Sequence, residues 1–203
     1  MRGYPLVLDG ATLSAVVVGG GAVATRKVRA LLDAGAAVRV VAPRMSAELR
    51  ALAAASARLT LVERAYRPGD VGDATLVIAA ADSRAVNRAV ACDGRAARRL
   101  VNVADAPREG NCVTVAAHRA GDLLVAVFAG GVPGAAARVR DAIAARFDDR
   151  YARALRALGE LRARLRAAGG GEAWRGAASQ LVGDDFCASV ESGTFAERVA
   201  RWH

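Results

Sequence analysis

Short apolar runs alternate with stretches of helical periodicity over the first half of this chain of 203 residues. The apolar runs lie at 14–19, 36–43, 59–63, 74–80 and 99–103. Apolar residues recur at helical spacing over 23–34, over 46–55 with Ser46 as the N-cap, and over 83–98. Strands that alternate with helices are typical of a parallel sheet covered on both faces. The pattern therefore predicts an α/β fold with a doubly wound parallel sheet.

The pattern changes after Asn111. Two β-type runs at 112–118 and 122–128 are joined by residues 119–121, which predicts an antiparallel hairpin. Helical patterns follow at 134–148, 151–168, 172–181 and 194–202, the last two after a glycine run at 169–171. We expect a nucleotide-binding type of domain over 1–113, a small α+β segment over 114–150 and a helical C-terminal domain over 151–203.

The apolar fraction is 54%, but glycines and charges interrupt every apolar run well before the roughly 18 residues of a membrane span. The first residues also lack the apolar core of a secretory signal. We therefore expect a cytoplasmic protein that does not enter membranes. Its cysteines, Cys92, Cys112 and Cys187, lie far apart without CxxC spacing, which argues against a disulfide framework and a zinc ribbon.

The formal net charge of +9 suits a polyanionic partner. Nucleic acid is disfavoured, because the arginines are spread over every predicted helix and aromatic residues make up only 4% of the chain. A small polycarboxylate fits the charge equally well. The two histidines, His118 and His203, lie in no metal-like cluster, so we expect no metal site and interpret His118 as a strand residue.

Gly19, Gly21 and Ala24 match the pattern G-x-G-x-x-A directly after an apolar run and at the start of a predicted helix. Gly19 permits the tight turn, Gly21 lets the backbone approach a pyrophosphate, and Ala24 lets the helix pack closely on the strand. The helix N-terminus then offers free N–H groups to the anion. The motif predicts a Rossmann-type dinucleotide site.

The acidic residue that usually follows such a motif by about 20 positions, at the end of the second strand, is missing. That strand ends in Val41-Ala42-Pro43-Arg44. Backbone groups of Pro43 and Arg44 can hold a ribose instead, or Arg44 can stack on adenine or meet a 2′-phosphate. NADP is therefore open as the cofactor, and so is a solvated loop charge at Arg44.

Two more strands deliver carboxylates at the sheet edge where open α/β folds bind ligands. Ala81 and Asp82 follow the fourth strand, and we expect both to contact the cofactor. Asp105 follows the fifth strand and precedes Pro107. A carboxylate there can accept a proton from a substrate while the cofactor accepts a hydride. The residue pattern alone leaves Asp105 open between this catalytic role and that of a turn former.

Several segments of the first 150 residues together resemble the precorrin-2 dehydrogenases, including the amino-terminal module of bacterial siroheme synthase. They are YPLVLDG, VVVGGGAVATRKVRALLDAGAAVRVVAP, LVIAAADSRAVNRAV, NVADAP and AGDLLVAVFAGGVPGAAARVRD. The pairs Arg26-Lys27, Val86-Asn87 and Gly130-Gly131 fall in the family's register, as do Asn102 and Asp105.

This resemblance implies removal of a hydride and a proton from precorrin-2 to give sirohydrochlorin, for siroheme or cobalamin-type pigments. It implies NAD rather than NADP, because the family works without the ribose-binding acid and holds the cofactor on the segments matching residues 22–23 and 43–44. Asp105 matches the carboxylate implicated in the chemistry, and Asn102, Gly130 and Gly131 match substrate-binding positions. Residues 114–150 match a dimerisation element, so we expect a homodimer, with arginines engaging the carboxylates of the tetrapyrrole.

Some relatives also insert ferrous iron, and that activity stays open for this chain. The family often has Ser or Thr before the Gly-Gly pair, whereas this chain has Phe128-Ala129. The alternative hypothesis is a non-catalytic Rossmann module that senses NAD.

Overall fold

The computed structural model describes residues 3–168 and 171–202. The chain divides into two compact units, one ending at Thr114 and the other beginning at Val115. The predicted boundary at residue 150 stays a prediction. His203 and two residues of the glycine run lie outside the described residues.

The first unit is built on a parallel sheet of five strands in the order β3-β2-β1-β4-β5. The strands are β1 (Ser14–Val18), β2 (Ala37–Val41), β3 (Leu59–Val62), β4 (Leu76–Ala79) and β5 (Leu100–Val103). The helices are α1 (Ala22–Asp33), α2 (Ala47–Ala55) and α3 (Arg84–Ala96). At the centre, Val17 pairs with Val40 of β2 and Ile78 of β4. The predicted doubly wound Rossmann-type sheet is confirmed.

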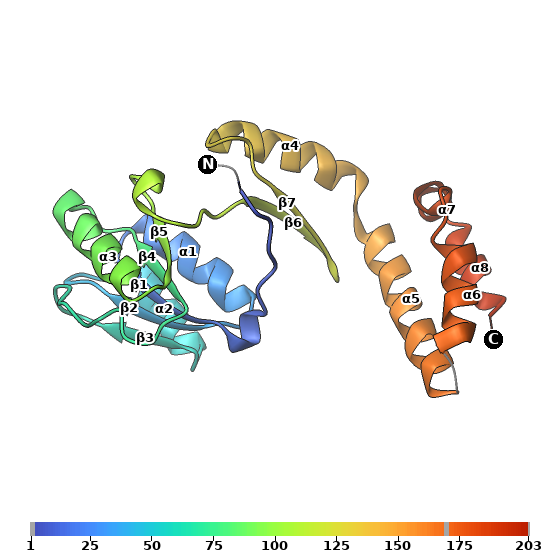
Figure 1. Cartoon of the computed structure of the whole chain (residues 1–203), viewed down its shortest axis with the longest axis horizontal. Coiled ribbons are helices and arrows are strands. Elements are labelled where there is room, and N and C mark those ends of the chain that lie inside the picture. Colours follow the sequence, from blue (N-terminus) through green and yellow to red (C-terminus); the bar gives the residue numbers. More distant parts are fainter. Residues whose placement is uncertain (1–2, 169–170, 203) are drawn as a thin grey trace. The chain divides into compact units, whose positions relative to one another are not determined.

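Both faces of this sheet are buried, which explains the unbroken apolar runs of its strands. Alternate residues of β1 point to opposite sides, with Val17 in the core under α1 and α2 and Val16 in the core under α3. Figure 1 allows the order of strands and helices to be followed. Val17 is fully buried.

Serine hydroxyls begin two of the helices. The Ser46 hydroxyl accepts a hydrogen bond from the Leu49 amide at 3.1 Å, so the predicted N-cap of α2 is confirmed. Ser83 caps α3 in the same way through the Val86 amide. Helix α1 differs, because its N-cap is Gly21, which has no side chain to satisfy the first amides.

The second unit begins with an antiparallel hairpin of β6 (Ala116–Ala120) and β7 (Leu123–Val127). The hairpin was predicted, but its position was wrong. Arg119 and Ala120 belong to β6, and the turn falls at Gly121, whose φ of +56° is costly for other residues. Cys112 does not begin a strand of the hairpin either. Its amide donates a hydrogen bond to the carbonyl oxygen of Val101 in β5.

Among the residues that the structure describes, five helices complete the second unit: α4 (Pro133–Arg146), α5 (Asp149–Ala167), α6 (Gly171–Leu181), α7 (Phe186–Ser192) and α8 (Phe195–Ala200). The sequence did not predict α7, which is too short to display helical periodicity. Tertiary packing forms it, because Phe186 and Val190 join a core with Tyr151 and Leu161 of α5. Every helix in the described part of the chain is too short or too polar to cross a membrane.

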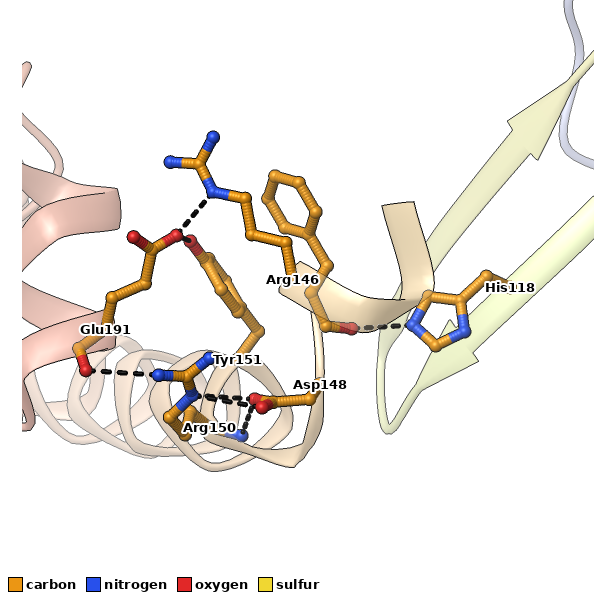
Figure 2. A network of polar contacts seen from close by, with 7 residues as sticks. His118, Arg146, Asp148, Arg150, Tyr151 and Glu191 are labelled. Atoms are coloured by element: carbon orange, nitrogen blue, oxygen red, sulfur yellow. Dashed lines mark hydrogen bonds and ion pairs between the residues drawn. The ribbon is translucent and has the colours of Figure 1, made fainter. Parts of the chain in front are cut away.

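A polar network joins α4, α5 and α7 around Glu191 (Figure 2). The Glu191 carboxylate accepts hydrogen bonds from Arg146 Nε at 2.6 Å and from the Tyr151 hydroxyl at 2.8 Å. Burial raises the pKa of the Tyr151 hydroxyl, which is therefore the donor in this contact. His118 lies in β6 as predicted, with its Nε2 2.6 Å from the carbonyl oxygen of Phe147.

Candidate active site at the carboxyl edge of the parallel sheet

Gly19 and Gly20, the first two residues of the glycine run, are required by packing within the protein. Gly19 has a φ of +132°, and a Cβ there would overlap the carbonyl oxygen of Ala80. A Cβ at Gly20 would overlap the carbonyl oxygen of Arg44. These two positions draw the ends of β1, β2 and β4 together at the turn.

Gly21 is different, because a Cβ there would meet no atom within 4 Å among the described residues beyond its immediate chain neighbours and the adjoining helix backbone. The packing of the protein therefore does not require glycine at this position. An open approach beside the uncapped N-terminus of α1 suits an anion, which the free amides and the helix dipole attract. This is the space that a dinucleotide's pyrophosphate would need.

The hydroxyl groups of Thr25 and Ser46 stabilise the glycine turn on its buried side. Thr25 is 2% exposed and donates from its hydroxyl to the carbonyl oxygen of Gly21 at 2.9 Å. The same hydroxyl lies 3.0 Å from that of Ser46 at the start of α2. The sequence pattern did not predict this pair, because its one local sign is a threonine within the helix that follows the glycine turn.

The other predicted cofactor residues surround the turn. Ala24 is fully buried within α1, whereas Ala22 and Val23 are exposed at its start. Pro43 and Arg44 are exposed in the loop after β2, at the place where the acidic residue is missing.

Asn87 holds the end of β4 in place. Its amide oxygen accepts from the Ala81 amide, and its amide nitrogen donates to the Ala81 carbonyl, both at 2.9 Å. Asn87 is fully buried, so this pairing fixes the backbone of Ala81 from inside the protein. Asp82, the next residue, is exposed.

Asp105 lies two residues beyond β5 with its side chain 39% exposed. Its nearest cation is Arg84 of α3, whose Nε lies 3.9 Å from Asp105 Oδ2. Arg84 also forms an ion pair with Glu109. Its Nη1 is buried without a hydrogen-bond partner among the described residues. The Asp105 carboxylate is thus accessible and faces a cation that the sequence pattern did not predict.

Asn102 lies in the interior, at 4% exposure. Its amide oxygen accepts from Lys27 Nζ at 2.8 Å, and its amide nitrogen donates to the Cys112 carbonyl at 3.2 Å. Burial lowers the pKa of the Lys27 ammonium, and neighbouring Arg26 lowers it further. Burial raises the pKa of the Cys112 thiol. Both functional atoms of the Asn102 side chain are thus used within the protein.

Gly130 and Gly131 belong to the second unit, in the loop between β7 and α4. Their φ values of +57° and +93° explain the glycines, because other residues are strained there. Among the residues that the structure describes, no group of three or more His, Cys, Asp or Glu side chains is arranged to hold a metal ion.

Comparison with known proteins gives a family match. Residues 6–116 match a family described as putative NAD(P)-binding. The siroheme synthase of Pseudomonas fluorescens (strain Pf0-1) is 44% identical over 116 residues, which are 57% of this chain and 25% of that protein. The siroheme synthase of Saccharophagus degradans is 41% identical over 137 residues, which are 67% of this chain and 30% of that protein. The chain thus spans between 25% and 30% of these curated relatives.

A solved structure extends the likeness to both units. SirC, a precorrin-2 dehydrogenase, has a TM-score of 0.80 and 26% sequence identity, with 98% of this chain and 99% of that chain covered. These matches confirm the resemblance drawn from the motifs. The chain belongs to the putative NAD(P)-binding family and is a relative of the precorrin-2 dehydrogenases and siroheme synthases.

Proposed function

We propose that this protein oxidises precorrin-2 to sirohydrochlorin, with NAD as the electron acceptor. The observation that carries the proposal is the accessible carboxylate of Asp105 at the same sheet edge as the open glycine turn. The likeness to a precorrin-2 dehydrogenase over 98% of the chain supports the same conclusion. The relatives' further activities are not implied, because this chain spans only part of their length.

The dinucleotide would be held by residues 19–24, with its pyrophosphate at the start of α1. Pro43 and Arg44 would contact the adenosine half, and Ala81 and Asp82 would line the route toward the nicotinamide. Bound NAD supplies the hydride acceptor. We propose NAD rather than NADP, since Arg44 is exposed in a loop that can offer backbone groups to an unphosphorylated ribose.

Asp105 would act as the general base. The bound nicotinamide would accept a hydride from one C–H bond of the substrate, and the Asp105 carboxylate would accept the proton that leaves a second position. The substrate loses two hydrogens and two electrons, and the products are sirohydrochlorin, NADH and a proton. Because the carboxylate is exposed, it can pass that proton on to solvent.

Gly130 and Gly131 would contact the substrate, with arginines pairing with its carboxylates. Since the Asn102 side chain is bonded within the protein, its proposed part in substrate binding is indirect, through the loop that it holds. We further propose a cytoplasmic homodimer formed through residues 114–150. The hairpin packs on α4, and this element leaves apolar side chains uncovered, since Val132 and Val139 are 59% and 49% exposed.

The test is an anaerobic incubation of the wild-type protein with precorrin-2 and NAD. We expect NADH and sirohydrochlorin to appear in equal amounts, with far less turnover when NADP replaces NAD. NADH binding without any turnover would instead favour the NAD-sensing module. A parallel incubation with ferrous iron, followed by its absorption spectrum, tests whether the product becomes siroheme.

A further inference from the structure

Lys27 forms a bridge between three segments of the first unit. It is the sixth residue of α1, the helix whose N-terminus lies at the glycine turn. Its Nζ donates to Asn102 Oδ1 of β5 at 2.8 Å and to Thr114 Oγ1 at 3.1 Å. The amine therefore links α1 to one residue before Asp105 and to another after it.

The segment 104–113 is closed at its base by these contacts. The Asn102 amide nitrogen donates to the Cys112 carbonyl at 3.2 Å, and the Asn111 side chain accepts from the Val101 amide at 2.7 Å. A Cβ at Gly110 would overlap the carbonyl oxygen of Val101, so the returning chain runs tightly along β5. Between these ends, Arg84 of α3 contacts the loop at Asp105 and Glu109.

We propose that Lys27 is a positioning residue for the reaction, because it fixes the loop that carries Asp105 to the helix that begins at the nucleotide turn. This inference rests on the proposed function. Hydride and proton transfer need the carboxylate and the nicotinamide at a set separation, and small displacements of a catalytic group are costly. The hydrogen bonds of Lys27 connect α1 to both ends of the loop, so the position of Asp105 depends on the position of the helix that begins at the glycine turn.

The chain offers a matched control for charge. Arg26 is the neighbour of Lys27 on α1 and is exposed, so Arg26→Met removes one positive charge without removing the bridge. Thr114 provides a second test, since Thr114→Val removes one acceptor of the Lys27 amine and Thr114→Ser keeps it.

The experiment measures three quantities in Lys27→Met, Lys27→Arg, Thr114→Val, Thr114→Ser and Arg26→Met. They are hydrogen exchange of the backbone amides in 104–113, the dissociation constant of NADH and kcat with precorrin-2. In Lys27→Met we expect about tenfold faster exchange in the loop and about tenfold lower kcat, with NADH affinity unchanged. Thr114→Val should share the effect in weaker form, and Lys27→Arg should restore part of kcat.

The inference would be overturned if Lys27→Met exchanged the amides of 104–113 at the wild-type rate or kept the wild-type kcat. An equal loss of kcat in Arg26→Met would overturn it as well. A general loss of folding would accelerate exchange throughout the sheet and weaken NADH binding, which would also count against a positioning role. Wild-type protein without turnover, combined with loop exchange that still depends on Lys27, would instead refute the proposed function while leaving the bridge established.

Discussion

The Nε atom of Arg84 lies 3.9 Å from Oδ2 of Asp105, so a cation at the start of α3 faces the proposed proton acceptor beyond β5. The side chains of Arg84 and Asp105 are 40% and 39% exposed. An exposed pair of this kind contributes less than about 1 kcal/mol to folding stability. Its consequence is orientation, because Arg84 also pairs with Glu109 in the same loop.

Replacing Arg84 by Gln should therefore separate orientation from stability. We expect the free energy of unfolding to change by less than about 1 kcal/mol. We expect kcat to fall by about three- to tenfold, because the loop loses the cation that holds two of its carboxylates. Steady-state kinetics and urea unfolding measure the two effects, and Arg84→Lys should lie between Gln and wild type. Unchanged kcat in Arg84→Gln would contradict the orienting role.

Asp105→Asn removes the proposed base while keeping the size of the side chain. We expect kcat with precorrin-2 to fall by about 10²- to 10⁴-fold, the range typical of a lost general base. Folding and NADH binding should be unchanged, since the side chain is exposed and lies outside the glycine turn. Stopped-flow absorbance and NADH fluorescence measure these quantities. The exposed Asp82, proposed only to line the cofactor route, provides a comparison: Asp82→Asn should reduce kcat much less.

Gly19 and Gly21 should respond to serine in opposite ways. In Gly21→Ser the new side chain meets open space and can cap α1, so stability should hold or rise while NADH affinity falls by about tenfold or more. In Gly19→Ser the positive φ and the overlap with Ala80 should cost about 3 kcal/mol. Thermal unfolding and NADH titration distinguish the two. Normal NADH affinity in Gly21→Ser would exclude the turn as the pyrophosphate site.

Replacing Arg44 by Ala distinguishes between the two nicotinamide cofactors. If Pro43 and Arg44 hold the ribose through backbone groups, Arg44→Ala should change kcat/KM for NAD by less than about threefold. If the guanidinium binds a 2′-phosphate, the same change should selectively destroy activity with NADP, by about tenfold or more. Parallel kinetics with both cofactors measure this, and a strong wild-type preference for NADP would refute the choice of NAD.

Asp70 makes the free energy of unfolding depend on pH in the acidic range. It is 8% exposed and accepts hydrogen bonds from both terminal nitrogens of Arg64, which lower the pKa of its carboxyl group. The lowered value means that the unfolded chain binds a proton more readily, so the stabilisation is complete above the ordinary pKa of about 3.9 and is lost as the pH falls through the folded value.

Asp70→Asn should accordingly lower the free energy of unfolding at neutral pH by about 1–3 kcal/mol, and the difference from wild type should shrink in acid. Urea unfolding over a pH series measures it. The control is Asp73→Asn, at an exposed position of the same loop, which should leave the wild-type pH dependence in place. A difference that stays constant down to strongly acidic pH would contradict the assignment to Asp70.

Local patterns were sufficient for the elements of the first unit. The apolar runs identified all five strands of the sheet, because strands buried on both faces are continuously apolar instead of alternating between apolar and polar residues. Ser46 marked the start of α2, since a cap acts within a single turn. Prediction failed at the hairpin, where the chain at Asn111 and Cys112 pairs with β5 instead of starting a strand. That pairing depends on a partner ten residues away, which no local pattern records.

By itself, the sequence determined the order of elements, the glycine turn and the carboxylate beyond the fifth strand, because each follows from backbone preferences within a few residues. Only the tertiary structure decided what those residues contact. The bridge from Lys27 to Asn102 and Thr114, the cation of Arg84 beside Asp105 and the occupied amide of Asn102 join positions up to 87 residues apart. Such contacts arise when strands pack into a sheet and their carboxyl ends meet at one edge.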